Sequence, residues 1–118
     1  MKIYIAGPMR GVPEFNFPAF QAAAARLRAQ GHVVFSPAEH DKKKWGAEFA
    51  KGNTDGDEQL AEKTYGFSLR DALASDTRWI CLHADAVALL PGWQQSKGAT
   101  AERALGIALN LEIMDLAP

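Results

Sequence analysis

Residues 85–109, DAVALLPGWQQSKGATAERALGIAL, set the fold that we expect for the whole chain. The apolar run 86–90 ends at Pro91-Gly92, which is the pattern of a short strand covered on both faces in a parallel sheet. A loop follows, and a helix is expected over residues 97–109. Because open α/β sheets bind ligands beyond the carboxyl ends of their strands, a small-molecule site is expected at this loop and helix start.

Outside this stretch, the chain continues to alternate strand and helix patterns. Strands are expected over residues 2–6, 33–35 and 111–114, and helices over residues 18–30 and 67–83. A strand, helix, strand order implies right-handed parallel crossovers. The predicted fold class is therefore α/β, a small doubly wound, flavodoxin-like or Rossmann-like parallel sheet of four to five strands with helices on both faces.

One segment departs from this alternation. Residues 39–66 are polar, punctuated by glycine and without a sustained apolar period, so we expect a long surface excursion with about one helical turn. Loops of this length are uncommon inside a compact domain and are often functional or mobile. The excursion is either a lid over a site or a solvated insertion.

Composition limits the class of protein. The chain has 118 residues, 47% of them hydrophobic and 23% charged, which is enough for one core, so residues 1–118 are predicted to form a single domain. Thirteen basic and fourteen acidic residues give a net charge of -1. No basic stretch is interleaved with aromatic residues, which excludes a nucleic-acid polymer as the expected partner.

The cellular location is predicted from the cysteine count, the N-terminal sequence and the length of the apolar runs. The single cysteine, Cys81, cannot form an internal disulfide and is expected to be buried, and the sequence begins directly in a strand pattern without a signal peptide. No apolar run approaches the roughly 20 residues that span a bilayer. These features predict a cytoplasmic protein that does not interact with a membrane.

Glu102 is the first candidate catalytic residue. It follows the start of the expected helix 97–109, where the helix dipole favours a negative charge, so the carboxylate is expected to stay ionised at neutral pH. It shares a helix face with Leu105 and Leu109 and could point towards the sheet, as a nucleophile must. The alternative is an ordinary first-turn glutamate that completes a helix cap.

Asp76 is the second candidate. It falls on a stripe with Leu69, Leu73 and Ile80, where loss of solvation would raise its pKa and let it act as a proton donor. The alternative is a buried aspartate satisfied by a hydroxyl or by Arg78. One ionised and one protonated carboxyl group are the pair that breaks a glycosidic bond.

Several residues could contact a substrate. Ser96, with Lys97-Gly98 after it, suits an anion at a helix N-terminus, although serine is also a common helix cap. Arg10 could bind phosphate or carboxylate, and Trp93 could stack on a nucleobase or only close the domain edge. The candidate substrate-binding residues are Gly7, Arg10, Trp93, Ser96 and Gly98. Tyr4, a phenol in the first strand, joins the candidate catalytic residues.

Other chemistry is not indicated. The three histidines, His32, His40 and His83, lack the spacing of a metal site, and Asp85 is assigned a structural role. The sequence has no GxGxxG motif and no P-loop, which argues against a dinucleotide enzyme or an NTPase. No cofactor and no metal are therefore expected.

Three stretches together resemble a known family. They are IYIAGPMRG (3–11), HVVFSPAE (32–39) and ADAVALLPGWQQSKGATAERALGIAL (84–109). They are similar to the nucleoside 2-deoxyribosyltransferase-like superfamily, most closely its small bacterial and phage branch. The most specific part is LPGWxxSKGAxxE, and residues 42–66 are not covered. Better-known relatives transfer the sugar of 2-deoxynucleosides to another base or hydrolyse deoxynucleoside 5-monophosphates.

The resemblance implies a role for each matching residue. Glu102 corresponds to the nucleophile near the start of the last major helix, and Ser96 to the serine that binds the 5-phosphate in the monophosphate hydrolases. Tyr4 and Arg10 correspond to the tyrosine of the first strand and the arginine of the following loop. Asp76 matches an aspartate of the preceding helix. The resemblance also implies a homodimer.

The expected function is cleavage or transfer at the N-glycosidic bond of a 2-deoxynucleoside or its 5-monophosphate. The partner is then a small nucleoside or nucleotide. Relatives of the resembled superfamily continue past their last strand, whereas this sequence stops at Pro118. Pro8 also occupies the position at which the hydrolases have a serine. The alternative is therefore a non-catalytic nucleotide-binding or sensing module that uses the same crevice. A purely structural or interaction protein is the third interpretation.

Overall fold

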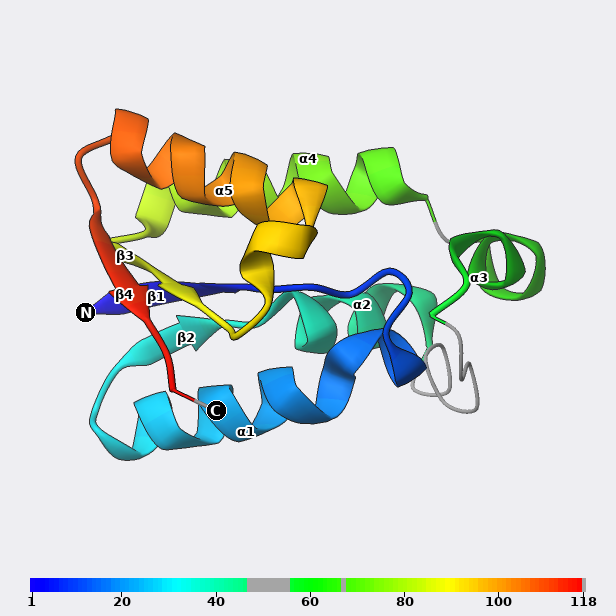
Figure 1. Ribbon diagram of the computed structural model, residues 1–118, viewed down its shortest axis with the longest axis horizontal. Helices are drawn as coiled ribbons and strands as arrows, with labels where there is room; N and C mark the ends of the chain where they lie inside the picture. The colour runs from blue at the N-terminus through cyan, green and yellow to red at the C-terminus, as the bar shows by residue number, and fades with distance from the viewer. Residues whose placement is uncertain (47–55, 67, 118) are drawn as a thin grey trace.

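The computed structural model describes residues 1–46, 56–66 and 68–117, which form a parallel sheet flanked by helices (Figure 1). The described residues hold four strands, adjacent in the order β2-β1-β3-β4, and every neighbouring pair is parallel. The strands are β1 (Lys2–Ala6), β2 (Val33–Phe35), β3 (Ala86–Leu89) and β4 (Glu112–Asp115). The predicted α/β class and parallel crossovers are confirmed.

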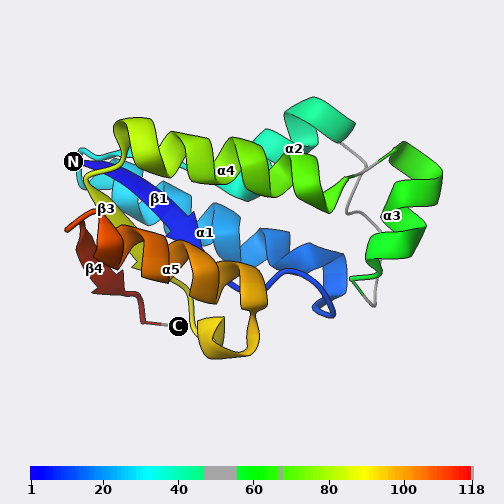
Figure 2. The same cartoon turned by 90° about the horizontal axis from the view of Figure 1, so that it is seen from above.

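The two central strands are covered on both faces, as their apolar sequences predict. Helix α1 (Phe17–Ala29) lies on one face, while α4 (Leu69–His83) and α5 (Lys97–Ala108) lie side by side on the other (Figures 1 and 2). All four residues of β3 are buried. The helices expected over 18–30, 67–83 and 97–109 are therefore confirmed within two residues at each described end.

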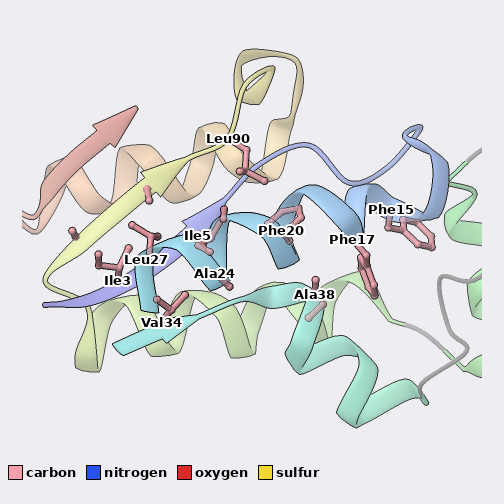
Figure 3. Close-up of a cluster of buried hydrophobic side chains, with 14 of the residues drawn as sticks. Ile3, Ile5, Phe15, Phe17, Phe20, Ala24, Leu27, Val34, Ala38 and Leu90 are labelled. Atoms are coloured by element: carbon pink, nitrogen blue, oxygen red, sulfur yellow. The ribbon is translucent and has the colours of Figure 1, made fainter. Parts of the chain in front are cut away.

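Alternation along β1 divides the core into two layers. Ile3 and Ile5 pack with α1, and Tyr4 and Ala6 belong to the layer beneath α4 and α5. Figure 3 shows the α1 layer, in which Leu27 and other apolar residues of α1 meet β1. Each buried side chain of this size contributes about 1.5–3 kcal/mol. The same alternation turns the Tyr4 phenol towards α5.

Small residues seat α5 closely on the sheet. A Cβ atom on Gly106 would lie 2.9 Å from a methyl carbon of Val87, so the helix approaches β3 more closely than a larger residue would allow. The buried stripe of α5 consists of Ala99, Glu102 and Gly106. Leu109, expected on this face, is instead 41% exposed. Glu102 therefore lies on the buried face of α5, between the small residues Ala99 and Gly106.

The polar segment 39–66 is more helical than the sequence suggests. Helix α2 (Pro37–Trp45) follows β2 directly, and α3 (Glu58–Tyr65) begins at Asp57, whose side chain caps it. The expectation of about one helical turn is therefore wrong, while residues 47–55 of the expected excursion lie outside the described residues. Proline occupies the first helical position of α2, where its fixed φ favours helix and no N–H is needed.

Two further expectations concern single residues. Asp85 accepts a hydrogen bond from the backbone N–H of Lys2 at 2.8 Å, which is the structural role assigned to it. Cys81, expected to be buried, is exposed, because the neighbouring Ile80 takes the inward position on α4. In the described ranges, no helix combines the length and apolar character needed to cross a membrane.

Candidate functional site

A cavity of about 540 Å³ opens beyond the carboxyl end of β1. Its walls come from the loop after β1, from α2 and α4, and from the start of α5. This is the crevice in which open α/β sheets bind ligands, and its size suits a small organic molecule. The β3–α5 unit, which the sequence places at the site, supplies one wall.

Four acidic or phenolic groups form the inner end of this cavity, and we call them the carboxyl floor. Each comes from a different element: Tyr4 from β1, Asp41 from α2, Asp76 from α4 and Glu102 from α5. All four are buried, with Tyr4 wholly inaccessible. The fold therefore brings together the three candidate catalytic residues named from the sequence, and it adds a fourth group.

A short hydrogen bond in the floor joins Tyr4 to Glu102. The Tyr4 hydroxyl donates to Oε2 of Glu102 at 2.5 Å, across 98 positions of sequence. Such a length is at the short end of the range for O–H···O hydrogen bonds. Burial, followed by the charges and hydrogen bonding of Glu102 and Asp76, raises the pKa of the Tyr4 phenol well above its usual value. The phenol therefore stays neutral.

Burial also dominates the electrostatics of Glu102. It raises the pKa of this carboxyl to about 8, against the lowering influence of the Tyr4 hydrogen bond. The expectation that the helix dipole keeps Glu102 ionised at neutral pH is therefore wrong. Glu102 is the sixth residue of α5, and the dipole acts within the first turn, which contains no acidic residue.

Asp76 behaves as its apolar stripe predicts. Burial raises its pKa to about 7, while hydrogen bonding with Tyr4 and the charge of Lys44 lower it. Its Oδ1 atom is buried without a hydrogen-bond partner among the described residues. The sequence suggested a hydroxyl or Arg78 as the partner of a buried Asp76. Neither forms a hydrogen bond to Oδ1, so this oxygen can accept one from a ligand or water.

Asp41 was missed in the sequence because its segment lacks a sustained apolar period. It is 3% exposed, lines the cavity, and its Oδ1 atom has no hydrogen-bond partner in the described chain. Burial and the nearby Asp76 raise its pKa to about 8, against the charge of Lys44. The available signal was Pro37 at a helix start, which places Ala38 and Asp41 on one face.

The outer part of the cavity has the opposite character, and we call Arg10, Ser96 and Lys97 the polar rim. Arg10 and Lys97 are exposed cations, whereas Ser96 is half-buried and accepts a hydrogen bond from the N–H of Ala99 at 3.1 Å. Ser96 thus caps α5 while lining the cavity. Arg10 pairs with Glu58 of α3 at 3.1 Å.

Two glycines predicted for substrate binding also line the cavity. A Cβ atom on Gly7 would lie 2.8 Å from side-chain carbons of Leu90, so only glycine lets the loop after β1 pass the end of β3 so closely. Gly98 lies in the first turn of α5. Gly7 is buried and Gly98 is half-buried.

Trp93 lies apart from this group. It is not among the residues that line the cavity, and its ring packs against the layer beneath α4 and α5, with the Arg103 guanidinium 4.9 Å from its centre. This placement corresponds to the alternative in which Trp93 closes the domain edge.

Metal binding has no assembled site in the described part of the chain, where no group of three or more His, Cys, Asp or Glu residues could hold an ion. The side chains that line the cavity include carboxyl groups, a phenol and cations at the rim. Such groups can transfer protons, attack an electrophilic carbon and hold an anion.

Comparison with known proteins gives a family without a stated activity. Searches of curated proteins and of solved structures found no match. A family described as a domain of unknown function, DUF4406, matches residues 1–115. Because this match includes every strand and helix of the fold and all the residues of the cavity, the chain belongs to the DUF4406 family.

Proposed function

We propose that this protein cleaves or transfers at the N-glycosidic bond of a 2-deoxynucleoside or its 5-monophosphate, with Glu102 as the nucleophile. The observation that carries the proposal is the buried Tyr4–Glu102 hydrogen bond at the inner end of a cavity whose outer end is cationic. The resemblance to the nucleoside 2-deoxyribosyltransferase-like superfamily assigns the same glutamate and tyrosine.

The reaction follows from the chemistry of the floor. Glu102, as a carboxylate, attacks the anomeric carbon, and the C–N bond breaks with its electron pair on the base. Asp76 supplies the proton that the departing base needs. Water or a second base then takes the sugar from Glu102, which gives hydrolysis or transfer respectively.

The polar rim would bind the phosphate end of a nucleotide. Ser96 and Glu102 are six residues apart on α5, a rise of about 9 Å along the helix. That span suits a sugar bearing a phosphate, with contacts at both ends. The N-terminus of α5, Lys97 and Arg10 would hold the anion. The apolar side chains of Met9 and Leu73 in the cavity wall suit a planar base.

A non-catalytic nucleotide-binding module is the second candidate function. The observation in its favour is the raised pKa of Glu102, about 8, because a protonated carboxyl group is not a nucleophile. A binder would use the same rim and cavity without forming a covalent bond. The two functions differ only in what happens to the glycosidic bond.

The test measures binding and base release together. Full-length protein is titrated calorimetrically with deoxynucleosides and their 5-monophosphates, and chromatography follows free base. We expect release by the wild type and a loss of at least about 10³-fold in Glu102→Gln, which keeps the side-chain shape. The matched control Glu112→Gln changes an exposed glutamate of β4 and should retain full activity.

Each other outcome has a defined meaning. Binding without base release rejects the enzyme and supports the binding module. Neither binding nor a shift in melting temperature with any nucleotide rejects both functions and leaves a structural role. Undiminished release by Glu102→Gln rejects Glu102 as the nucleophile even if the activity is real.

The proposal includes a homodimer in the cytoplasm, both taken from the resemblance and the sequence. Light scattering coupled to size-exclusion chromatography measures the assembly directly. A mass of one chain across the working concentration range would reject the dimer without affecting the proposed chemistry.

A further inference from the structure

Two aspartates of the carboxyl floor each keep one oxygen that the described protein does not satisfy. Asp41 is 3% exposed and Asp76 is 6% exposed, and both line the cavity. The Oδ1 atom of each is buried without a hydrogen-bond partner in the described part of the chain. Buried polar atoms are nearly always paired, so two unpaired acceptors beside one cavity indicate a ligand that donates hydrogen bonds.

These aspartates also lack a cation as partner. Buried carboxyl groups are usually paired with a basic side chain. Within residues 1–46, 56–66 and 68–117, the ion pairs join Arg10 to Glu58 and Arg28 to Glu39, and none includes Asp41 or Asp76. A purely structural role would leave both carboxyls uncompensated, whereas a ligand in the cavity can supply the missing donors.

The unpaired oxygens can turn towards a ligand. The terminal torsion of an aspartate side chain is broad and roughly two-fold, so rotation presents either carboxyl oxygen to the cavity. A carboxyl group also keeps an acceptor oxygen whether or not it is protonated. Both aspartates can therefore accept a hydrogen bond from the same ligand.

The order of the helices places these acceptors at the base end of a nucleotide. Helix α4 packs against both α5 and α2, so Asp76 comes from the helix between those that carry Glu102 and Asp41 (Figure 2). In the proposed reaction the sugar lies at Glu102 and its phosphate lies towards the start of α5. The base is on the other side of the anomeric carbon and would extend towards the two aspartates.

We propose that Asp41 and Asp76 together select a base that carries an exocyclic amino group, such as adenine or cytosine, over its oxo counterpart. This inference rests on the proposed function and names the substrate class of that site. An exocyclic amino group has two N–H donors, so it can donate one hydrogen bond to each aspartate. An oxo group has no donor and would place a third acceptor against two others.

The same contacts direct the proton that the departing base needs. The amino group lies beside a ring nitrogen that can accept a proton, N7 in adenine and N3 in cytosine. Asp76 accepts from the amino group with one oxygen and gives the proton of its other oxygen to that nitrogen. The C–N bond breaks with its electron pair on the base, so the base leaves neutral and Asp76 becomes a carboxylate. Asp41 forms and breaks no covalent bond and is a specificity-determining residue.

Matched pairs of substrates test the selection in the wild-type protein. The 5-monophosphates of deoxycytidine and deoxyuridine differ in an amino or oxo group at position 4, and those of deoxyadenosine and deoxyinosine differ likewise at position 6. Within each pair that is turned over, we expect kcat/KM for base release to be at least about 10²-fold higher for the amino member. Equal values, or higher values for the oxo member, would overturn the selection and leave the proposed function standing.

A variant at Asp41 tests which residue makes the choice. Asp41→Asn keeps the side-chain shape but adds an N–H donor, so the amide can also bind an oxo base. The preference for the amino member should fall by at least about tenfold, chiefly through a lower KM for the oxo member. Glu39→Gln is the matched control, because it changes an acid of the same helix that lies outside the cavity, and it should keep the wild-type preference. An unchanged preference in folded Asp41→Asn would overturn the role of Asp41.

Calorimetric titration with the same substrate pairs separates this inference from the proposed reaction. Tighter binding of the amino member without any base release would reject the reaction and support the selection. Base release with equal affinity and equal kcat/KM for both members would support the reaction and overturn the selection. Binding of neither member of either pair would reject both.

Discussion

The carboxyl floor and the polar rim lie in one cavity but depend on different physics. The floor consists of Tyr4, Asp41, Asp76 and Glu102, all buried, and its protonation is set by loss of solvation. The rim contains exposed cations and the start of α5, where solvent screens the charges. Substitutions in the floor should therefore have large effects that depend on pH, and substitutions in the rim should have small effects on affinity.

The largest expected effect is on the rate of base release when Asp76 is changed. Asp76→Asn keeps the shape but cannot donate a carboxyl proton, so the rate should fall by about 10²–10⁴-fold with little change in KM. Asp71→Asn changes an exposed aspartate of the same helix and should retain the wild-type rate. A substrate whose leaving group needs no proton should recover most of the loss. Equal losses with both substrates would remove Asp76 as the acid.

The second effect is on stability as a function of pH. The pKa values of Asp41, Asp76 and Glu102 are raised to about 8, 7 and 8, so the folded state binds more protons than the unfolded state above about pH 4. Their stabilising contribution is complete below the unfolded pKa values, declines as pH rises above about 4, and is lost once pH has passed the folded pKa values of about 7–8. At about 1.4 kcal/mol per pKa unit, several kcal/mol should be lost between pH 5 and pH 9.

Urea unfolding at these two pH values measures this loss. Asp41→Asn should flatten the dependence by removing one of the three groups, while Asp115→Asn, which changes an exposed residue of β4, should leave it unchanged. A wild-type protein that is as stable at pH 9 as at pH 5 would contradict the buried floor.

A smaller effect is expected at the rim when Ser96 is changed. Ser96→Ala removes the cap of α5 and should cost about 1 kcal/mol of stability, together with affinity for a 5-monophosphate. Ser68→Ala removes the corresponding cap of α4, outside the cavity, and should cost similar stability without loss of affinity. Calorimetric titration distinguishes the two. Equal affinity in both variants would assign Ser96 to the helix cap alone.

The smallest expected effect concerns the ion pair at the cavity mouth. Arg10 pairs with Glu58, so a phosphate must compete with this carboxylate for the guanidinium. Glu58→Gln should tighten binding of a 5-monophosphate by up to about fivefold, since exposed pairs contribute about 0–1 kcal/mol. Glu39→Gln breaks a different exposed ion pair, to Arg28, and should leave affinity unchanged. Weaker binding by Glu58→Gln would show that Arg10 is held in place by Glu58 for the ligand.

The rim and the floor also differ in how far they could be predicted from sequence, because the rim depends on local signals. The strands β1 and β3 and the helices α1, α4 and α5 follow from apolar period and from Gly and Pro punctuation, which are local signals. Ser96 was predictable both as a cap and as a rim residue, because both roles depend on its position before α5.

The features that the sequence did not predict depend on packing between segments that are distant in the chain. The protonation of Glu102 could not be predicted, because its burial depends on β1 and α4, which are distant in sequence and pack against α5. Asp41 was missed because α2 has only a short apolar face. The sequence of this helix does not indicate that Asp41 is buried in the cavity wall. Leu109 was misplaced because Gly106, not a leucine, contacts Val87.

In the proposed reaction, Glu102 becomes covalently attached to the sugar. The direct measurement is mass spectrometry of protein incubated with a 2-deoxy-2-fluoro nucleoside 5-monophosphate, an analogue whose glycosyl ester is slow to break. We expect one sugar phosphate per chain, located on the peptide containing Glu102 and absent from Glu102→Gln. Base release from the natural substrate without any adduct, or an adduct on another residue, would contradict it.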